Sequence, residues 1–214
     1  KLVAELPRLW LGRGVRVEWD GAEHIETAQA DGSGTLFLTP HLGCFEITAQ
    51  AYARRFGASH PMTVLFRPAR QAALRDLVAR SRQRPGLLTA PTTLAGVKQL
   101  IKALKAGDAV GLLPDQVPPA GQGVWAPFFG RDAYTMTLSA RLAHSGRTQV
   151  LVSWGERLSW GRGYRVHVRA FGPLESDPVQ AAGQINRAME ALVRECPAQY
   201  LWSYDRYKTP PPAR

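Results

Sequence analysis

Residues 34–56 read GTLFLTPHLGCFEITAQAYARRF, and this stretch decides the fold. Residues 35–39 contain an unbroken apolar run, which indicates a short strand buried on both faces. Pro40 ends the strand. From 45 to 56 the apolar spacing changes to the helical period, which predicts a helix with one packed face. A buried strand followed closely by an amphipathic helix is typical of an α/β domain.

His41 then lies where the strand ends, and Glu46 lies where the helix begins. Four residues separate them, enough for a turn that brings imidazole and carboxylate together. An imidazole that a carboxylate orients is a general base near neutral pH, and sites in open α/β sheets gather at the carboxyl ends of strands. We interpret this His-x4-Glu array as a candidate catalytic pair. A surface or structural role is the alternative, and Cys44 also allows a Cys–His nucleophile, although Cys is commonly just packed.

Size and charge limit the possible functions. The 214 residues are 45% hydrophobic, enough for one sizeable α/β domain with a full core. Lys and Arg number 27 against 17 acidic residues, a formal charge of +10. This excess favours anionic partners: nucleic acid, acidic protein, phosphorylated lipid or a membrane surface. Two distant cysteines argue against a disulfide scaffold, and no apolar run approaches the ~18 residues of a membrane span.

Further elements are expected along the whole chain. Apolar runs and alternation predict strands over 15–19, 63–66, 109–113, 148–154 and 164–169, the last two as a possible hairpin. Helical spacing predicts helices over 69–84, 135–144 and 178–195, and one that opens at 91–93 and stops at Gly107. The helix and strand around Gly107 form half of a βαβ crossover, which places Asp115 at the same sheet edge as His41.

Two connections are expected to be irregular. Residues 27–34 are polar and indicate a loop. Residues 117–134 form a long stretch rich in Pro, Gly and aromatic residues. Loops of this length are usually functional or disordered, and the aromatic content argues against disorder. We therefore interpret 117–134 as an ordered loop that shapes a substrate cleft, and loop packing is an equally good explanation.

Six motifs together resemble a known family. In chain order they are His41-x4-Glu46, Phe66-Arg67-Pro68, Arg82, Leu113-Pro114-Asp115-Gln116, Pro127-Phe128-Phe129-Gly130, and Gln199-Tyr200-Leu201-Trp202 through Arg206-Tyr207-Lys208. This order resembles the late acyltransferases of lipid A biosynthesis, within the lysophospholipid acyltransferase superfamily. A Glu at the fifth position after His is similar to the lipid A branch, since the glycerolipid branch usually has Asp. One departure is Ser81, where relatives often have Gly.

The resemblance implies a fold and a reaction. The fold would be a single α/β domain over 1–214, with a mixed, mostly parallel central sheet flanked by helices, like the glycerolipid acyltransferases. The reaction would transfer a fatty acyl chain from acyl carrier protein, without a cofactor, to a hydroxyl of a phosphorylated lipid A precursor. It would take place at the cytoplasmic face of the inner membrane, with its anionic surface as a partner. Family members typically carry an N-terminal membrane helix, which we expect to be missing from these residues.

The resemblance also implies site residues. His41 would be the general base and Glu46 would orient its ring, while Arg82 and Asp115 match positions that the family needs for activity. Arg82 could bind phosphate through its planar fork; a solvated Arg and a turn Asp are the alternatives. Substrate-binding candidates are Arg67, Gln116, Gly123, Phe128 and Phe129. No metal site is expected, because the five histidines are scattered without ligand spacing.

Several alternatives stay open at this point. The acceptor could be another membrane lipid, a glycerolipid or an aminolipid. A non-enzymatic basic α/β module that binds membrane surfaces is a second possibility. Nucleic acid is disfavoured, because the basic residues are dispersed and no recognition motif is present. Lys98, Lys102 and Lys105 share one helical face, which is either solvated or docks acidic acyl carrier protein. The sequence does not define an oligomeric state.

Overall fold

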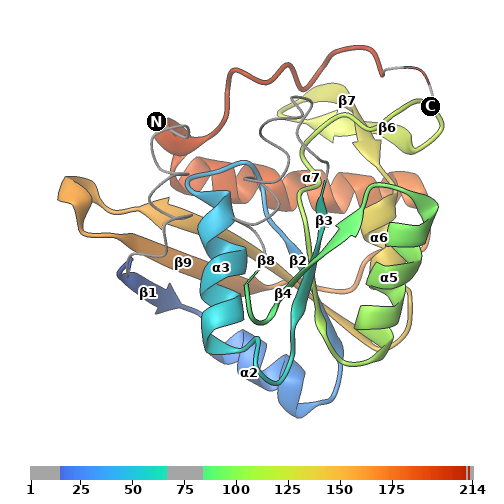
Figure 1. Ribbon diagram of the computed structural model, residues 1–214. Coiled ribbons are helices and arrows are strands. Elements are labelled where there is room, and N and C mark those ends of the chain that lie inside the picture. Colours follow the sequence, from blue (N-terminus) through green and yellow to red (C-terminus); the bar gives the residue numbers. More distant parts are fainter. Residues whose placement is uncertain (1–14, 67–83, 211, 213–214) are drawn as a thin grey trace, which may run out of the picture.

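The computed structural model describes residues 15–66, 84–210 and 212 (Figure 1). Seven strands form the main sheet in the order β1-β9-β8-β2-β5-β3-β4. Their bounds are Val17–Asp20 (β1), Gly34–Leu38 (β2), Met62–Phe66 (β3), Leu87–Pro91 (β4), Ala109–Leu112 (β5), Thr148–Arg157 (β8) and Tyr164–Ala170 (β9). Strands β8 and β9 pair antiparallel and every other neighbouring pair in this sheet is parallel, so the sheet is mixed but mostly parallel.

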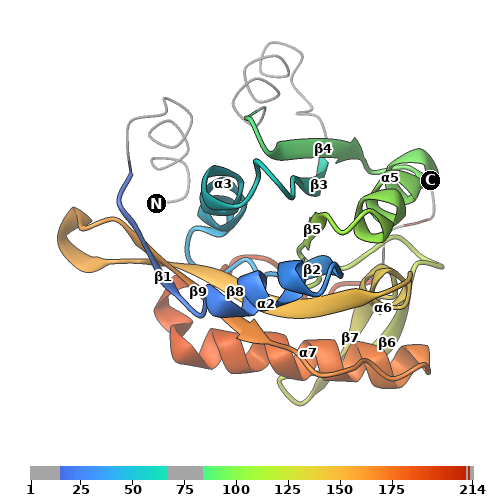
Figure 2. The same cartoon turned by 90° about the horizontal axis from the view of Figure 1, so that it is seen from below.

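Helices cover both faces of the sheet (Figures 1 and 2). They are Glu23–Ala30 (α2), Phe45–Arg55 (α3), Leu94–Lys105 (α5), Leu138–Ala143 (α6) and Pro178–Glu195 (α7). The central strand β2 shows why a layer of helices is needed on each face of the sheet. Leu36 and Leu38 pack on the side of α5, α6 and α7, whereas Phe37 packs on the side of α2 and α3. All three side chains are buried, which confirms the predicted fold class.

Most of the predicted elements are present. The strands around 35–39, 63–66 and 109–113 are confirmed as β2, β3 and β5, and the hairpin as β8 and β9. Side chains cap two of the helices at their first turns. Thr93 accepts a hydrogen bond from the Gly96 amide at the start of α5 (3.5 Å), and Asp177 accepts two at the start of α7, which has Pro178 in its first turn.

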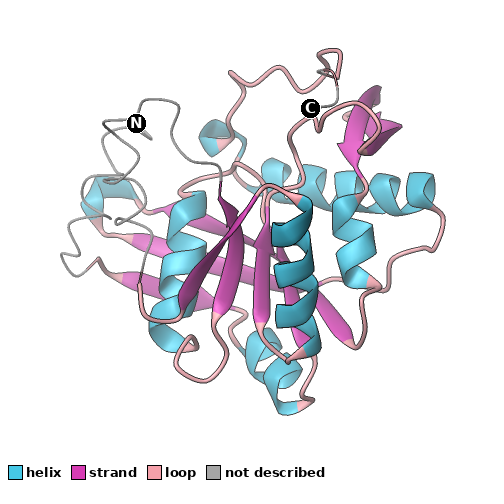
Figure 3. Cartoon of the chain, turned by 45° about the vertical axis from the view of Figure 1, so that its right-hand side comes forward, coloured by secondary structure: helices cyan, strands magenta, loops and turns pink. Residues whose placement is uncertain are grey.

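The predicted long loop over 117–134 was wrong in part. It contains β6 (Gly123–Phe128) and the start of β7 (Arg131–Met136), which pair as a separate antiparallel hairpin (Figure 3). The two residues between them, Phe129 and Gly130, both have positive φ, at 47° and 75°. This is the backbone of a two-residue hairpin turn whose twist matches that of the strands. The predicted helix over 135–144 accordingly shrinks to α6.

Other corrections concern short elements. The loop predicted from 27 begins within α2, a helix of eight residues that buries only Ile25 and Ala28. Strand β4 was not predicted, because its five residues follow a Pro-Gly pair directly. Leu94 is 69% exposed although it is apolar, since it is the first residue of α5. Of the predicted helix over 69–84, residues 69–83 lie outside the described part of the chain.

Candidate active site

The turn that follows β2 presents His41 at the carboxyl end of the sheet. Its backbone is held from two sides: the Leu201 amide donates to the His41 carbonyl oxygen (3.1 Å), and the Cys44 amide donates to the Gly155 carbonyl oxygen (2.8 Å). Gly43 is required here. Its φ is +60°, and a Cβ at this position would overlap the Gly155 carbonyl oxygen. The turn, β8 and the C-terminal segment therefore fix the imidazole together.

Asp115 is the carboxylate that contacts His41. One of its oxygens lies 2.7 Å from His41 Nδ1, and the other accepts the His41 backbone amide at 2.7 Å. The Asp115 side chain is 2% exposed and that of His41 is 15% exposed. Because β2 and β5 are parallel neighbours, residues that follow them meet at one edge. The predicted placement of Asp115 beside His41 is thus confirmed.

Gln116 lies on the other side of the ring. Its amide nitrogen is 3.1 Å from His41 Nε2. An amide N–H₂ group can only donate, so Nε2 is the acceptor and Nδ1 carries the proton that Asp115 receives. The two hydrogen bonds thus agree on one neutral tautomer. In that tautomer the lone pair of Nε2 is available to take a proton from a substrate.

The carboxylate bonded to Nδ1 of His41 is Asp115, whereas we predicted that Glu46 orients the ring. An orienting carboxylate binds Nδ1 of a general-base imidazole, and that nitrogen is bonded to Asp115. The sequence could not decide between the two carboxylates, since both follow the ends of neighbouring strands. Glu46 belongs to the first turn of α3, and its side chain lines a cavity. Phe45, the residue before it, lines the same cavity, and its ring centroid is 4.9 Å from that of His41.

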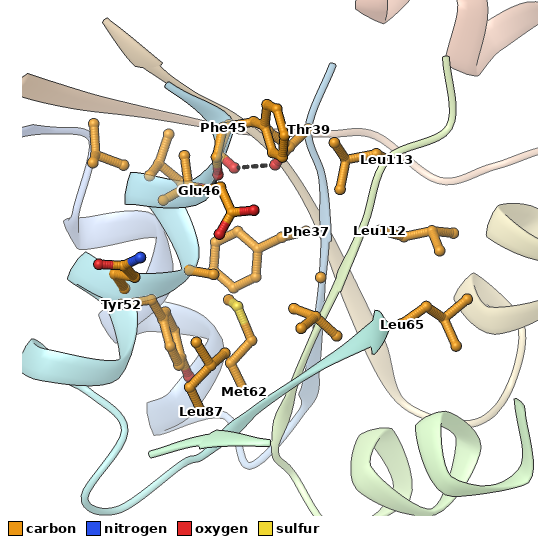
Figure 4. A pocket seen from close by; sticks show the side chains of 18 of the residues that line it. Phe37, Thr39, Phe45, Glu46, Tyr52, Met62, Leu65, Leu87, Leu112 and Leu113 are labelled. Atoms are coloured by element: carbon orange, nitrogen blue, oxygen red, sulfur yellow. Dashed lines mark hydrogen bonds between the residues drawn. The ribbon is translucent and has the colours of Figure 1, made fainter. Parts of the chain in front are cut away.

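The cavity lies between α3 and the sheet and has a volume of about 110 Å³ (Figure 4). Most of its wall is apolar, including Phe37, Tyr52, Met62, Leu87 and Leu112. At one end it reaches Thr39 and Phe45, which flank His41 in the sequence, and there the Thr39 and Ser153 hydroxyls lie 2.9 Å apart. This arrangement offers a mainly hydrocarbon environment next to the His41 turn.

The C-terminal segment contributes two residues, Tyr200 and Arg206, that were not predicted to belong to the site. The Tyr200 phenol hydrogen-bonds Asp115, and burial raises the pKa of this phenol well above its usual value, so that it remains a donor. Arg206 is 4% exposed, and its guanidinium donates to the Tyr134 carbonyl and the Thr135 hydroxyl, both at 2.7 Å. Burial lowers the pKa of Arg206, and the charge of Asp115 partly offsets that change.

One signal could have identified these residues. Gln199 to Lys208 is dense in aromatic and basic side chains, for which packing is the simplest explanation. Packing does describe Tyr207, whose hydroxyl donates to the Phe128 carbonyl at 2.8 Å. It does not describe Tyr204, whose hydroxyl accepts the Val117 amide at 2.9 Å and so holds the chain just after Gln116.

The other predicted site residues lie in different parts of the chain. Arg67 and Arg82 lie outside the described residues. Gly123 begins β6, and its amide donates to the Tyr134 hydroxyl. Phe128 is 2% exposed within the core beneath Arg206, and Phe129 packs between Arg194 and Trp202. Their substrate-binding roles stay predictions.

Two further observations concern the lysine face of α5 and the length of the helices. Lys98, Lys102 and Lys105 are all exposed on α5, so this face is open to solvent. Within the ranges that the structure describes, no helix has the length and apolar character needed to cross a bilayer.

Comparison with known proteins points to one family. Residues 14–209 match the family described as bacterial lipid A biosynthesis acyltransferase. The chain is 27% identical to a lipid A biosynthesis acyltransferase of Haemophilus influenzae, an alignment that covers 91% of this chain and 60% of the relative. It is 28% identical to the lipid A biosynthesis palmitoleoyltransferase of Escherichia coli (94% and 65%) and 29% identical to its lauroyltransferase (89% and 61%). The chain thus spans less than two thirds of the length of these relatives.

Proposed function

The chain belongs to the bacterial lipid A biosynthesis acyltransferase family, and from this premise we propose that it transfers a fatty acyl chain to a hydroxyl of a lipid A precursor. The proposed donor is the thioester of acyl carrier protein. The proposed location is the cytoplasmic face of the inner membrane, where the phosphorylated acceptor resides in an anionic leaflet. The formal charge of +10 suits acidic partners of this kind.

One observation carries the proposal. His41 is bonded through Nδ1 to a buried carboxylate, Asp115, and its Nε2 accepts a hydrogen bond from Gln116 at the sheet edge where α/β enzymes hold their substrates. This is the arrangement of a general base, because Asp115 fixes the tautomer and stabilises the imidazolium that forms. The hydroxyl of an acceptor can replace the Gln116 amide at Nε2.

The proposed reaction needs no covalent acyl-enzyme. His41 Nε2 takes the proton of the acceptor hydroxyl as its oxygen attacks the thioester carbonyl. The tetrahedral intermediate carries a negative oxygen, and we propose that the Gln116 amide, released from Nε2, donates to it. Collapse of the intermediate forms the ester and breaks the C–S bond. The imidazolium then returns the proton to the leaving thiolate, which restores neutral His41.

The remaining site residues have proposed roles in substrate binding. The apolar cavity between α3 and the sheet suits part of the acyl chain, since its walls are mainly hydrocarbon. Glu46 stands at its His41 end and would border the thioester. Arg67 and Arg82 are proposed to bind acceptor phosphate, for which a guanidinium fork is suited.

Mass spectrometry of lipid A tests this function. Cells that carry the complete gene and cells that lack it are compared, with a plasmid copy as complementation and a His41→Ala copy as its matched control. We expect lipid A from the deletion strain to lose the mass of one acyl chain, and only the unmodified copy to restore it. Identical lipid A with a change in another lipid class would instead indicate a different acceptor.

A further inference from the structure

The hairpin between β8 and β9 ends in a tryptophan that takes no part in the core. Trp160 is 97% exposed, with φ 62° and ψ 28°, a left-handed conformation that is costly for a bulky residue. A large aromatic side chain held in water in this way stabilises neither the hairpin nor the sheet. This combination suggests that the side chain meets a partner.

The tip of the hairpin is positively charged. We define it as residues 157–163, RLSWGRG, which contain Arg157 and Arg162 and no acidic residue. The acidic side chains just behind it are already paired: Glu18 with Arg165 at 2.9 Å, and Glu156 with His167 at 3.0 Å. The tip therefore combines one exposed indole with a local cationic charge.

Strand direction places this tip on the same edge of the sheet as the candidate active site. Strand β8 runs parallel to β2, and its Gly155 is hydrogen-bonded to the turn that carries His41. Five residues lead from Gly155 to Trp160, so the tip lies at most about 17 Å beyond that turn. Both views show the hairpin extending past the rest of the sheet (Figures 1 and 2).

A second exposed tryptophan lies at the same edge. Trp202 is 59% exposed, and it follows Leu201, whose amide donates to the His41 carbonyl oxygen. Its indole is oriented by a hydrogen bond from Nε1 to the Pro197 carbonyl oxygen (2.7 Å). The two most exposed tryptophans of the described residues thus both belong to segments attached to the His41 turn.

We propose that the hairpin tip inserts into the headgroup region of an anionic lipid bilayer, with Trp160 as its anchor. Tryptophan is the side chain that favours the membrane–water interface, and the exposed Arg162 beside it attracts anionic headgroups. A protein partner suits this tip less well, because an aromatic anchor in a protein interface needs surrounding residues that exclude water. Inserted in this way, the hairpin turns the His41 edge toward the bilayer. The reason for such an orientation, a lipid acceptor, rests on the proposed function.

Binding to vesicles tests the inference without any assay of activity. Purified chain is sedimented with vesicles of phosphatidylcholine alone and of phosphatidylcholine with about one quarter phosphatidylglycerol. We expect Trp160→Ala to weaken binding to the mixed vesicles by about tenfold, because much of the indole would leave water there. Arg162→Gln should weaken it about fivefold, the factor that corresponds to ~1 kcal/mol per cation, and should not weaken binding to neutral vesicles.

The matched control is Val179→Ala. Val179 is 49% exposed in the first turn of α7, at the other end of the sheet from the hairpin, and its replacement should leave binding unchanged. Because Trp160 touches no core residue, its variant should keep the wild-type circular dichroism spectrum. Equal vesicle binding by wild type and Trp160→Ala overturns the inference, as does a loss of binding to acyl carrier protein in its place. Neither result affects the proposed chemistry of His41, which is assayed on detergent-dispersed acceptor.

Discussion

At the residue scale, the site depends on which groups surround Asp115. This carboxylate accepts the backbone amide and the ring nitrogen of His41, and the Tyr200 phenol is a further donor. Each donor stabilises the charged carboxylate. The two hydrogen bonds from His41 hold the imidazole in one orientation.

Tyr200→Phe tests this arrangement. It removes one donor to Asp115 and leaves the ring in place, so we expect kcat/KM to fall about tenfold. With one donor fewer, Asp115 holds an imidazolium more tightly. The acidic limb of the pH–rate profile should therefore move to higher pH, because His41 must be neutral to act as a base. The matched control is Tyr204→Phe, whose hydroxyl contacts the Val117 amide, and its profile should not move. Unchanged limbs in both variants would show that Tyr200 only packs.

The sequence predicted part of this site for a clear reason. His41 and Asp115 were placed correctly because each follows a short buried strand, and parallel strands end at one edge. The partner of Nδ1 could not be predicted, since Glu46 and Asp115 have the same chemistry and only the direction of each side chain separates them. Tyr200 joins the site from more than 80 residues further along the chain, and local patterns do not predict such contacts.

At the scale of elements, ion pairs between side chains strengthen the pairing of the edge strand β1 with β9. Asp20 receives Arg169 at 2.7 Å and His167 at 2.8 Å, and Glu18 receives Arg165 at 2.9 Å. The hydrogen bond from Arg169, followed by that from His167, holds the pKa of Asp20 below its usual value. A carboxyl group of this kind stabilises the fold above its unfolded pKa, and the contribution disappears as the pH falls through the folded pKa.

Asp20→Asn should therefore lower the free energy of unfolding at neutral pH, and the deficit should vanish in acid. The expected loss is only ~0.5–1 kcal/mol, because the pair is half exposed, and it should shrink as the pH falls below the ordinary Asp pKa of about 3.9. Thermal unfolding of both proteins across a pH series measures it. Asp132→Asn, at an exposed position of β7, is the control. A deficit that persists undiminished in acid would mean that the ion pairs do not attach β1.

The elements also show where patterns suffice and where they fail. Long periodic segments such as α7 and unbroken apolar runs such as β2 were predicted within a few residues, because packing and local preference agree. The β6–β7 hairpin was missed because its turn uses Phe129 in a left-handed conformation, which its sequence does not announce. Helix α2 was missed because a helix of eight residues with two buried side chains has almost no periodic signal.

At the scale of the whole molecule, the segments that form the candidate site lie at one edge of the sheet. The His41 turn, the Asp115–Gln116 segment, the C-terminal segment and the β8–β9 hairpin all meet there, although they come from distant parts of the chain. A formal charge of +10 predicts that partners carry negative charge, but it does not predict where such a partner would bind. The edge that we propose for this contact follows from strand direction.

We propose above all that His41, oriented by Asp115, is the base of an acyl transfer. The most direct test is single-turnover transfer from acyl-acyl carrier protein to detergent-dispersed lipid A precursor, followed by mass spectrometry. The proteins compared are wild type, His41→Ala, Asp115→Asn and the double variant. We predict a loss of ~10²–10⁴-fold for His41→Ala, a severe loss for Asp115→Asn, and little further loss when the two are combined, because they act as one unit. Transfer by folded His41→Ala at close to the wild-type rate would contradict the claim.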